Sequence, residues 1–208
     1  MNIIYGGRGA ASLGDVPIYR LGEVATIRTG KRPREVIEGG RFAFVNGGVV
    51  ESGRVDEWNC RGGVTTIPSR GSVGVVGYQW SDFWLGPLCY EVRANPEVLI
   101  DRFLYFSLKA NQRKIVALQQ TGSIPALNKK ELTGVEVTVP PLDIQREIVT
   151  ILDSFTKLEA ELEAELEARR AQYAFYRDQL LNFESARKGG ADEYSRPSAV
   201  RGRVGSLG

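Results

Sequence analysis

The chain has 208 residues and a formal net charge of +2, and its 42% apolar and 25% charged residues suit one globular domain with an appendage. It contains no histidine, which removes the commonest general base and metal ligand, and its two cysteines are too few for a zinc site. Glycine-rich nucleotide loops and the GxSxG nucleophile elbow are also missing, so the composition favours a binding protein over an enzyme.

The first half of the chain is predicted to be rich in β-structure. Residues 1–17 predict a loose lead-in, without the basic and apolar regions of a signal peptide. A short amphipathic stretch ends at Gly30, and residues 41–58 then alternate apolar and polar side chains around an Asn46-Gly47 turn signal. Further β-rich blocks cover residues 62–80 and 83–94, and Asn95-Pro96 ends the last of them.

The glycines, cysteines and aromatic residues of these blocks each predict a structural feature. Glycines recur at every third position from Gly71 to Gly77, which predicts bulges or close approach of another backbone. The cysteines at 60 and 89 are expected to be free thiols. Aromatic side chains in β-structure usually pack inside, so a core position is expected for Trp58, Trp80, Phe83, Trp84 and Tyr90.

Helical patterns then follow. Residues 96–118 carry apolar side chains at helical spacing, and a polar loop, a short helix and the strand 134–140 come next. A long helix is predicted over residues 143–183, with Asp143 as its N-cap. Residues 184–208 are rich in Gly, Ser and Arg and are expected to be disordered.

The apolar residues of the long helix form a stripe at the a and d spacings of a coiled coil, although the strict heptad drifts after Leu162. Forty residues make a rod of about 60 Å, too long to be one face of the preceding domain. No second such helix is present in the chain, so the stripe is expected to pair with a helix of another chain. Its residues are Ile148, Leu152, Phe155, Leu158, Leu162, Leu166, Tyr173, Tyr176 and Leu180.

Charge is unevenly distributed along the chain. Residues 1–145 hold 17 Lys+Arg and 14 Asp+Glu, for a net +3, whereas residues 146–183 hold 5 and 8, for a net −3. A mildly basic domain is compatible with nucleic-acid binding without requiring it. No run of about eighteen apolar residues predicts a membrane span.

The order of several segments resembles the specificity (S) subunits of type I restriction-modification systems. The segments "LGEVATIRTGKRP", "FVNGGVVESGRVDEWN", "FWLGPLCYEV" and "TGSIPALNKKELTGVEVTVPPLDIQREIVTILD" carry the resemblance over residues 19–183. A strand, "PPL", a glutamine three residues later and then a helix is the most specific part. The resemblance implies an α/β (α+β) target-recognition domain over residues 18–142, followed by a long, protruding coiled-coil-type α-helix.

The family's properties carry further expectations. A full S subunit has two recognition domains and two helices that pair antiparallel, whereas this chain has one of each. The resemblance therefore implies a half subunit that pairs with itself or with another S chain and reads a bipartite double-stranded DNA site. It implies no catalysis and no bound cofactor here, with S-adenosylmethionine held by methyltransferase (M) subunits, a restriction (R) subunit as further partner, and a cytoplasmic location.

Three groups of polar residues are the candidate DNA contacts, since arginine reads guanine edges and hydroxyl or amide groups bind phosphate oxygens. The alternative is a solvated surface turn for the first group, a polar hairpin for the second, and a solvated helix start for the two lysines of the third. Turn chemistry alone accounts for Asn46-Gly47. The groups are Lys31, Arg32 and Arg34; Ser69, Arg70 and Ser72; and Gln120, Thr121, Ser123, Lys129 and Lys130.

Three other interpretations of the whole chain stay open. The first is a coiled-coil scaffold with no role on DNA, and the second is an inactive truncated fragment of an S subunit. The third is the binding domain of a single-chain restriction–methylation enzyme that has lost its methyltransferase part. Loss of DNA targeting with intact dimerisation, on removal of the candidate cations, separates the recognition hypothesis from the scaffold.

Overall fold

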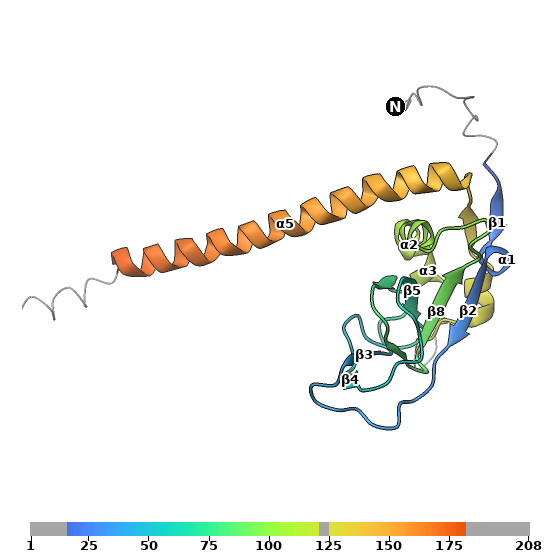
Figure 1. Ribbon diagram of the computed structural model, residues 1–208, viewed down its shortest axis with the longest axis horizontal. Coiled ribbons are helices and arrows are strands. Elements are labelled where there is room, and N and C mark those ends of the chain that lie inside the picture. The colour runs from blue at the N-terminus through green and yellow to red at the C-terminus, as the bar shows by residue number, and fades with distance from the viewer. Residues whose placement is uncertain (1–15, 121–124, 182–208) are drawn as a thin grey trace, which may run out of the picture. The chain divides into compact units, whose positions relative to one another are not determined.

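The computed structural model describes residues 16–120 and 125–181 of the chain. It divides the chain into two compact units, of which one ends at Ser154 and the other begins at Phe155. The first unit holds all the strands and the four shorter helices of the described residues, together with the first turns of the long helix (Figure 1).

A four-stranded antiparallel sheet forms the centre of the first unit. Its strand order is β2-β8-β5-β6, so β6 lies at one edge. The strands are β2 (Ala25–Thr29), β5 (Val64–Pro68), β6 (Gly77–Gln79) and β8 (Cys89–Ala94). The β-rich blocks expected over residues 62–80 and 83–94 are thereby confirmed, and β8 ends at the residue before the predicted Asn95-Pro96 break.

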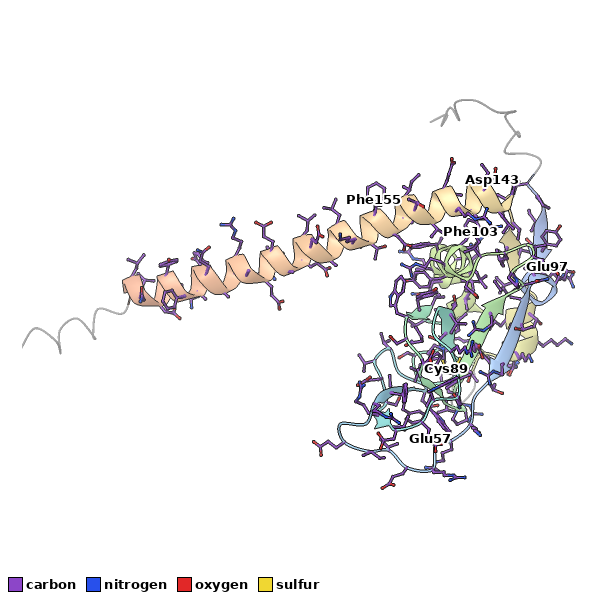
Figure 2. The ribbon with its side chains drawn as sticks, in the orientation of Figure 1. Glu57, Cys89, Glu97, Phe103, Asp143 and Phe155 are labelled. Carbon is purple, nitrogen blue, oxygen red and sulfur yellow. The ribbon has the colours of Figure 1, made fainter. Side chains whose placement is uncertain are left out.

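The main core lies between one face of this sheet and two helices. The helical pattern over residues 96–118 is confirmed, but the structure divides it at Asn111 into α2 (Asp101–Ala110) and α3 (Gln112–Ala117). Ile27, Ile67 and Val92 of the sheet pack in one cluster with apolar side chains of these helices. Figure 2 labels one of them, Phe103 on α2. The other face of the sheet is covered near Cys89 by a smaller apolar cluster.

A second, three-stranded sheet lies beside the first, in the order β4-β3-β7. Its strands are β3 (Phe42–Val45), β4 (Arg54–Val55) and β7 (Trp84–Leu85). Strands β3 and β4 pair antiparallel, which confirms the predicted hairpin. The turn is not a tight Asn46-Gly47 turn, however, because the connection runs over residues 46–53 and the Asn46 side chain binds Leu88 instead.

The two ends of the domain meet in a two-stranded sheet. β1 (Ile18–Arg20) pairs antiparallel with β9 (Glu136–Thr138), and α1 (Leu21–Val24) contacts α4 (Lys129–Thr133). The predicted short helix and strand before the two prolines are thus confirmed. This pairing fixes the point from which the long helix starts.

The long helix α5 spans Leu142–Leu181 and so has forty residues, as its pattern predicted. The N-cap prediction is wrong, because the helix begins one residue before Asp143. The Gln145 backbone amide donates to the Pro141 carbonyl at 3.0 Å and closes the first turn. Asp143 lies within that turn, where its negative charge suits the positive end of the helix dipole.

The expectation for the aromatic residues holds in part. Phe83, Trp84 and Tyr90 are buried as predicted, but Trp58 and Trp80 are exposed. Trp80 follows the edge strand β6, and its ring packs on the Tyr78 ring and on the Arg102 guanidinium. A side-chain partner at the surface therefore replaces the core contacts that the β-pattern predicted.

Candidate nucleic-acid interface

The loop after β2 is held by backbone contacts to β7. The Lys31 amide donates to the Leu85 carbonyl at 3.1 Å, and the Trp84 indole N–H donates to the Lys31 carbonyl at 2.8 Å. Gly30 lies so close to Leu85 that a Cβ would fall 1.9 Å from its carbonyl oxygen, which requires glycine there. The main chain of Lys31 is therefore fixed, while its exposed ammonium lies 5.5 Å from the centre of the Trp84 ring.

Two arginines of the same loop line a surface hollow. Arg32 and Arg34 are exposed on either side of Pro33, and with Asn46 and Leu88 they border a hollow of about 520 Å³. The Asn46 Oδ1 accepts a hydrogen bond from the Leu88 amide at 2.9 Å. Asn46 therefore supports the floor of this hollow, in agreement with the structural interpretation of that residue.

The second candidate group packs against the Asn46-Gly47 segment from the other side. The Ser72 amide donates to the Gly47 carbonyl at 2.8 Å. Gly71 has a φ of +77°, and a Cβ on it would fall 2.4 Å from the Gly47 carbonyl oxygen. The close backbone approach predicted for this glycine is confirmed, and it leaves the Arg70 side chain exposed beside the junction.

Ser69 connects the second group to the third. Its side chain is buried, its amide donates to the Leu88 carbonyl at 2.9 Å, and its carbonyl accepts from the Leu127 amide at 2.9 Å. Ser69 thus supports the loop from within. Through Leu127 it places the start of α4, with the exposed Lys129 and Lys130, next to the Arg70 loop.

The rest of the third group lies before α4. The Gln120 amide donates to the Ala126 carbonyl at 2.8 Å, and its side-chain amide donates to Glu131 Oε1 at 3.3 Å. Thr121 and Ser123 lie outside the described residues. The contacts of Leu85, Leu88, Ser69 and Leu127 therefore connect the described residues of the three groups at the end of the sheet where β2 ends. Six exposed cations lie on these connected segments: Lys31, Arg32, Arg34, Arg70, Lys129 and Lys130.

A buried carboxylate organises two more arginines nearby, which sequence reasoning missed. Glu91 Oε2 accepts from Arg28 Nε at 2.6 Å, and Glu91 Oε1 accepts from Arg93 Nε at 2.9 Å. Burial raises the pKa of Glu91, but the two guanidinium partners outweigh burial and hold this pKa below its usual value. Arg28 on β2 is the cross-strand partner of Glu91 on β8, and Arg93 follows Glu91 two residues later on β8. The only sequence signal was the alternation of charged and apolar residues along these strands.

The described residues offer no metal centre and no reactive thiol. No group of three or more carboxylate, cysteine or histidine side chains lies close enough to hold a metal ion within residues 16–120 and 125–181. Cys60 and Cys89 are buried free thiols, as expected. Burial raises the pKa of each to about 12, so both are neutral near pH 7 and poor nucleophiles.

The base of the long helix is anchored by one fully buried glutamine. Gln145 Oε1 accepts from the Ile100 amide at 2.9 Å, while its Nε2 donates to the Val98 and Pro140 carbonyls at 2.9 and 2.7 Å. This is the glutamine of the sequence "PPLDIQ". The motif therefore has a structural role, because the side chain satisfies three backbone groups at the junction of domain and helix.

A second anchor, about two turns after Gln145, joins α5 to α2. Arg102, which is only 8% exposed, donates to Asp153 of α5 at 2.6 Å. Its guanidinium also lies within 4.3–4.8 Å of four ring centres, those of Tyr78, Trp80, Tyr105 and Phe106. Cation–π contacts and the ion pair together account for a buried arginine in an apolar setting. Sequence reasoning missed it, because Tyr78, Trp80 and Asp153 are far from Arg102 along the chain.

Beyond Ser154 the apolar stripe of α5 is exposed. Phe155, labelled in Figure 2, is 64% exposed, and the later stripe residues from Leu158 to Leu180 are exposed as well. Ile148 differs, because it packs against the core of the first unit, and Leu152 is half-buried. No helix of the described residues has the length and apolar character to cross a membrane.

Known proteins resemble this chain in sequence. The family model described as "type I restriction modification DNA specificity domain" matches residues 14–168. A putative type I specificity subunit of Mycoplasma pneumoniae is 29% identical over 170 residues, which cover 79% of this chain and 46% of that protein.

Two solved structures share the fold. The S subunit of a type I restriction-modification system from M. genitalium aligns with a TM-score of 0.68 and 23% identity, covering 86% of this chain and 51% of that one. The HsdS subunit of Thermoanaerobacter tengcongensis aligns with a TM-score of 0.57 and 25% identity, covering 76% and 41%. The chain thus spans about half the length of the relatives it matches.

Proposed function

The chain belongs to the family of type I restriction-modification DNA specificity domains, and from this premise we propose that it reads a short sequence of double-stranded DNA and directs a separate methyltransferase there. The observation that carries the proposal is the set of exposed cations on the connected segments at one end of the sheet. Arg32, Arg34 and Arg70 lie there on loops whose backbones are fixed by hydrogen bonds.

Fixed loops with exposed arginines suit the two tasks of DNA recognition. Phosphate contacts set the position of a protein on the duplex, while arginine and polar side chains read base edges in the major groove. The exposed ammonium groups of Lys129 and Lys130 suit the first task. The hollow beside Arg32, Arg34 and Asn46 suits the second, because it gathers two guanidinium groups on one surface.

The assembly proposed for the chain is a homodimer joined by α5. One recognition domain reads one half-site, and the exposed apolar stripe from Phe155 to Leu180 needs a partner helix. Two identical chains related by a two-fold axis read two identical half-sites, so the target is a gapped palindrome. Pairing with another S chain would give an asymmetric bipartite site instead.

Catalysis belongs, in this proposal, to partner subunits. Methyltransferase subunits that hold S-adenosylmethionine would flip and methylate the target adenine, and a restriction subunit would join them. The support for these partners is family membership. The chain's own residues would bind and position the DNA. A net +3 over residues 1–145 is modest, so the partners are expected to add to the grip on DNA.

Two matched double variants test the recognition surface. Lys129→Ala/Lys130→Ala removes the two cations proposed to contact phosphate, whereas Arg146→Ala/Lys157→Ala removes two exposed cations from α5. Binding to a random-sequence 30-base-pair duplex is measured by fluorescence anisotropy at several salt concentrations. Each lost phosphate contact lowers the slope of log K against log salt by about 0.9. The first variant should therefore lose about 1–2 from this slope, and the second should keep it.

Sedimentation of the same variants separates recognition from a scaffold. Both should retain the oligomeric state of the unaltered chain, because none of the four cations lies in the apolar stripe. Equal DNA binding by both variants would contradict the proposed interface and favour a scaffold without a role on DNA.

A further inference from the structure

A buried carboxylate holds two arginines together on one face of the central sheet. Glu91 of β8 is only 5% exposed, and its two carboxylate oxygens accept from Arg28 Nε at 2.6 Å and from Arg93 Nε at 2.9 Å. Strands β2 and β8 lie side by side (Figure 1), so Arg28 is opposite Glu91, and Arg93 lies on the same face two residues along β8. Both guanidinium groups therefore converge on one carboxylate.

The Glu91 triad (Arg28, Glu91 and Arg93) carries one positive charge more than its carboxylate balances. One arginine is enough to pair Glu91, and replacing a buried ion pair with apolar residues often leaves stability unchanged or higher. Stability therefore gives no reason for the second arginine. The side chains of Arg28 and Arg93 are 54% and 35% exposed, so the surplus positive charge faces solvent.

Main-chain carbonyls hold each guanidinium group from a second side. Arg28 Nη2 donates to the Asn59 carbonyl at 3.2 Å, and Arg93 Nη2 donates to the Arg61 carbonyl at 2.9 Å. These two bonds and the two bonds to Glu91 use Nε and Nη2 of both arginines, and none of the four uses Nη1. Two oriented N–H groups on each Nη1 atom therefore face the surroundings of the triad, where an outside acceptor can bind them.

The triad is linked to the candidate nucleic-acid interface through Asn59. The Asn59 side chain accepts from the Leu85 amide at 2.6 Å and donates to the Leu85 carbonyl at 3.1 Å. The same carbonyl accepts from the Lys31 amide at 3.1 Å. Arg28 precedes Lys31 by three residues, near the end of β2. The exposed guanidinium groups of the triad therefore border the cations of the loop after β2.

We propose that Arg28 and Arg93 clamp one phosphate group of the DNA backbone, with Glu91 as the residue that positions them. The phosphate oxygens accept from Nη1 of the two arginines, while Glu91 keeps the like-charged guanidinium groups side by side. Arginine suits this task because its planar, fixed set of donors matches the oxygens of a phosphate. The clamp rests on the proposed function and deepens it, because it adds the face of the sheet to the loops at its end.

The clamp has a defined part in recognition. Phosphate contacts fix the register of a protein on the duplex and carry no sequence information. Arg28 and Arg93 lie on strands of the central sheet, and strands move less than loops. A phosphate held there is a fixed reference point for the arginines of the loops. Loss of the clamp should therefore weaken binding to all sequences alike, without changing which sequence is preferred.

Neutralising the whole triad tests the clamp without leaving Glu91 buried and unpaired. Arg28→Gln/Glu91→Gln/Arg93→Gln removes two positive charges and one negative charge. Binding of the full chain to a random-sequence duplex of about 30 base pairs is measured by fluorescence anisotropy over a series of salt concentrations. The triad variant should bind about tenfold more weakly. It should also lose about 0.9 from the slope of log K against log salt, the value for one phosphate.

A second triple variant controls for the change in net charge. Glu165→Gln/Arg169→Gln/Arg170→Gln removes the same charges from exposed positions of α5, away from the sheet. It should bind the duplex with the affinity and salt slope of the unaltered chain. Equal losses in the two triple variants would mean that net charge alone matters, and would overturn the clamp.

Replacing both arginines with lysine tests the geometry at constant charge. Arg28→Lys/Arg93→Lys keeps both positive charges beside Glu91 but removes the planar fork of donors. This variant should bind the duplex severalfold more weakly than the unaltered chain. Its urea unfolding should stay cooperative, because each ammonium group can still pair with the carboxylate. Binding equal to that of the unaltered chain would overturn a clamp made by guanidinium groups.

The variant Lys129→Ala/Lys130→Ala separates failure of the clamp from failure of the proposed function. If this variant loses salt slope while the triad variant keeps it, DNA recognition stands and the clamp is refuted. If the unaltered chain does not bind the duplex at all, the proposed function fails and the clamp fails with it. Losses in the Lys129/Lys130 variant, the triad variant and the lysine variant together support the clamp.

Discussion

Replacing Gln145 with alanine should lower the free energy of unfolding of the domain by about 4 kcal/mol. The side chain is fully buried and makes three hydrogen bonds to the backbone of Val98, Ile100 and Pro140. Each neutral hydrogen bond contributes about 1 kcal/mol net, and the lost buried methylene adds about 0.8 kcal/mol. Gln172→Ala is the matched control, because Gln172 is an exposed glutamine of the same helix.

Urea unfolding followed by tryptophan fluorescence measures both variants. The Gln145 variant should show a much lower midpoint at an unchanged slope, while the control should match the unaltered chain. Gln145→Glu sharpens the test, since it sets a carboxyl oxygen against two carbonyl oxygens. The pKa of the new carboxyl group should be raised in the folded state. The free energy of unfolding of this variant should therefore fall as pH rises above about 4.3, the ordinary pKa of Glu. An unchanged midpoint for Gln145→Ala would refute the anchoring role.

Three further predictions concern the other buried polar groups of the domain. Arg102→Ala removes the ion pair to Asp153 and four aromatic contacts, and should lower the free energy of unfolding by about 2–3 kcal/mol. An unchanged midpoint of urea unfolding would contradict this. The pKa of Glu91 is lowered by its two arginines, so its contribution to the free energy of unfolding should be present above about pH 4.5 and lost as pH falls below that value. The free energy of unfolding of Glu91→Gln should therefore depend less on pH in acid than that of the unaltered chain. An equal dependence on pH in both proteins would contradict this role. Cys60 and Cys89 have a pKa of about 12 each, so both thiols should resist iodoacetamide at pH 8 until urea unfolds the chain. Because the pKa of each thiol is raised in the folded state, the free energy of unfolding should decline above about pH 9. Rapid labelling of the native chain would contradict their burial.

The elements that depend on local pattern were predictable from sequence. The forty-residue helical pattern of α5, the two prolines before it and the β-rich blocks that contain β5 and β8 are local signals, and all appear in the structure. Gly71 was predictable as a close approach of backbones, because glycine inside a β-rich block commonly marks a bulge or a neighbouring main chain.

Features that depend on contacts between distant residues were not predictable. Trp80 was expected in the core, yet it lies at the surface on Arg102, which comes from another element. The pairing of Arg28 with Glu91 depends on the register of β2 against β8, which alternation alone does not fix. Gln145 was noticed as part of a motif, but its three partners lie on segments that meet only in the folded domain.

The candidate DNA contacts were only partly predictable from the sequence. Sequence reasoning chose Arg32, Arg70 and Lys129 from three separate segments on composition and polarity. The structure brings these segments together through the backbone hydrogen bonds of Ser69 and through Asn46. Their contact with DNA stays a prediction.

The central claim is that this chain chooses the DNA site at which a methyltransferase acts, and a methylome tests it most directly. The chain is expressed with the methyltransferase subunit of its own system in a host free of adenine methylation, and N6-methyladenine is mapped across the genome. The account predicts methylation at a gapped palindrome, which Arg32→Ala/Arg70→Ala should abolish or reduce. A soluble chain that yields no new methylation beside an intact methyltransferase subunit would contradict the claim.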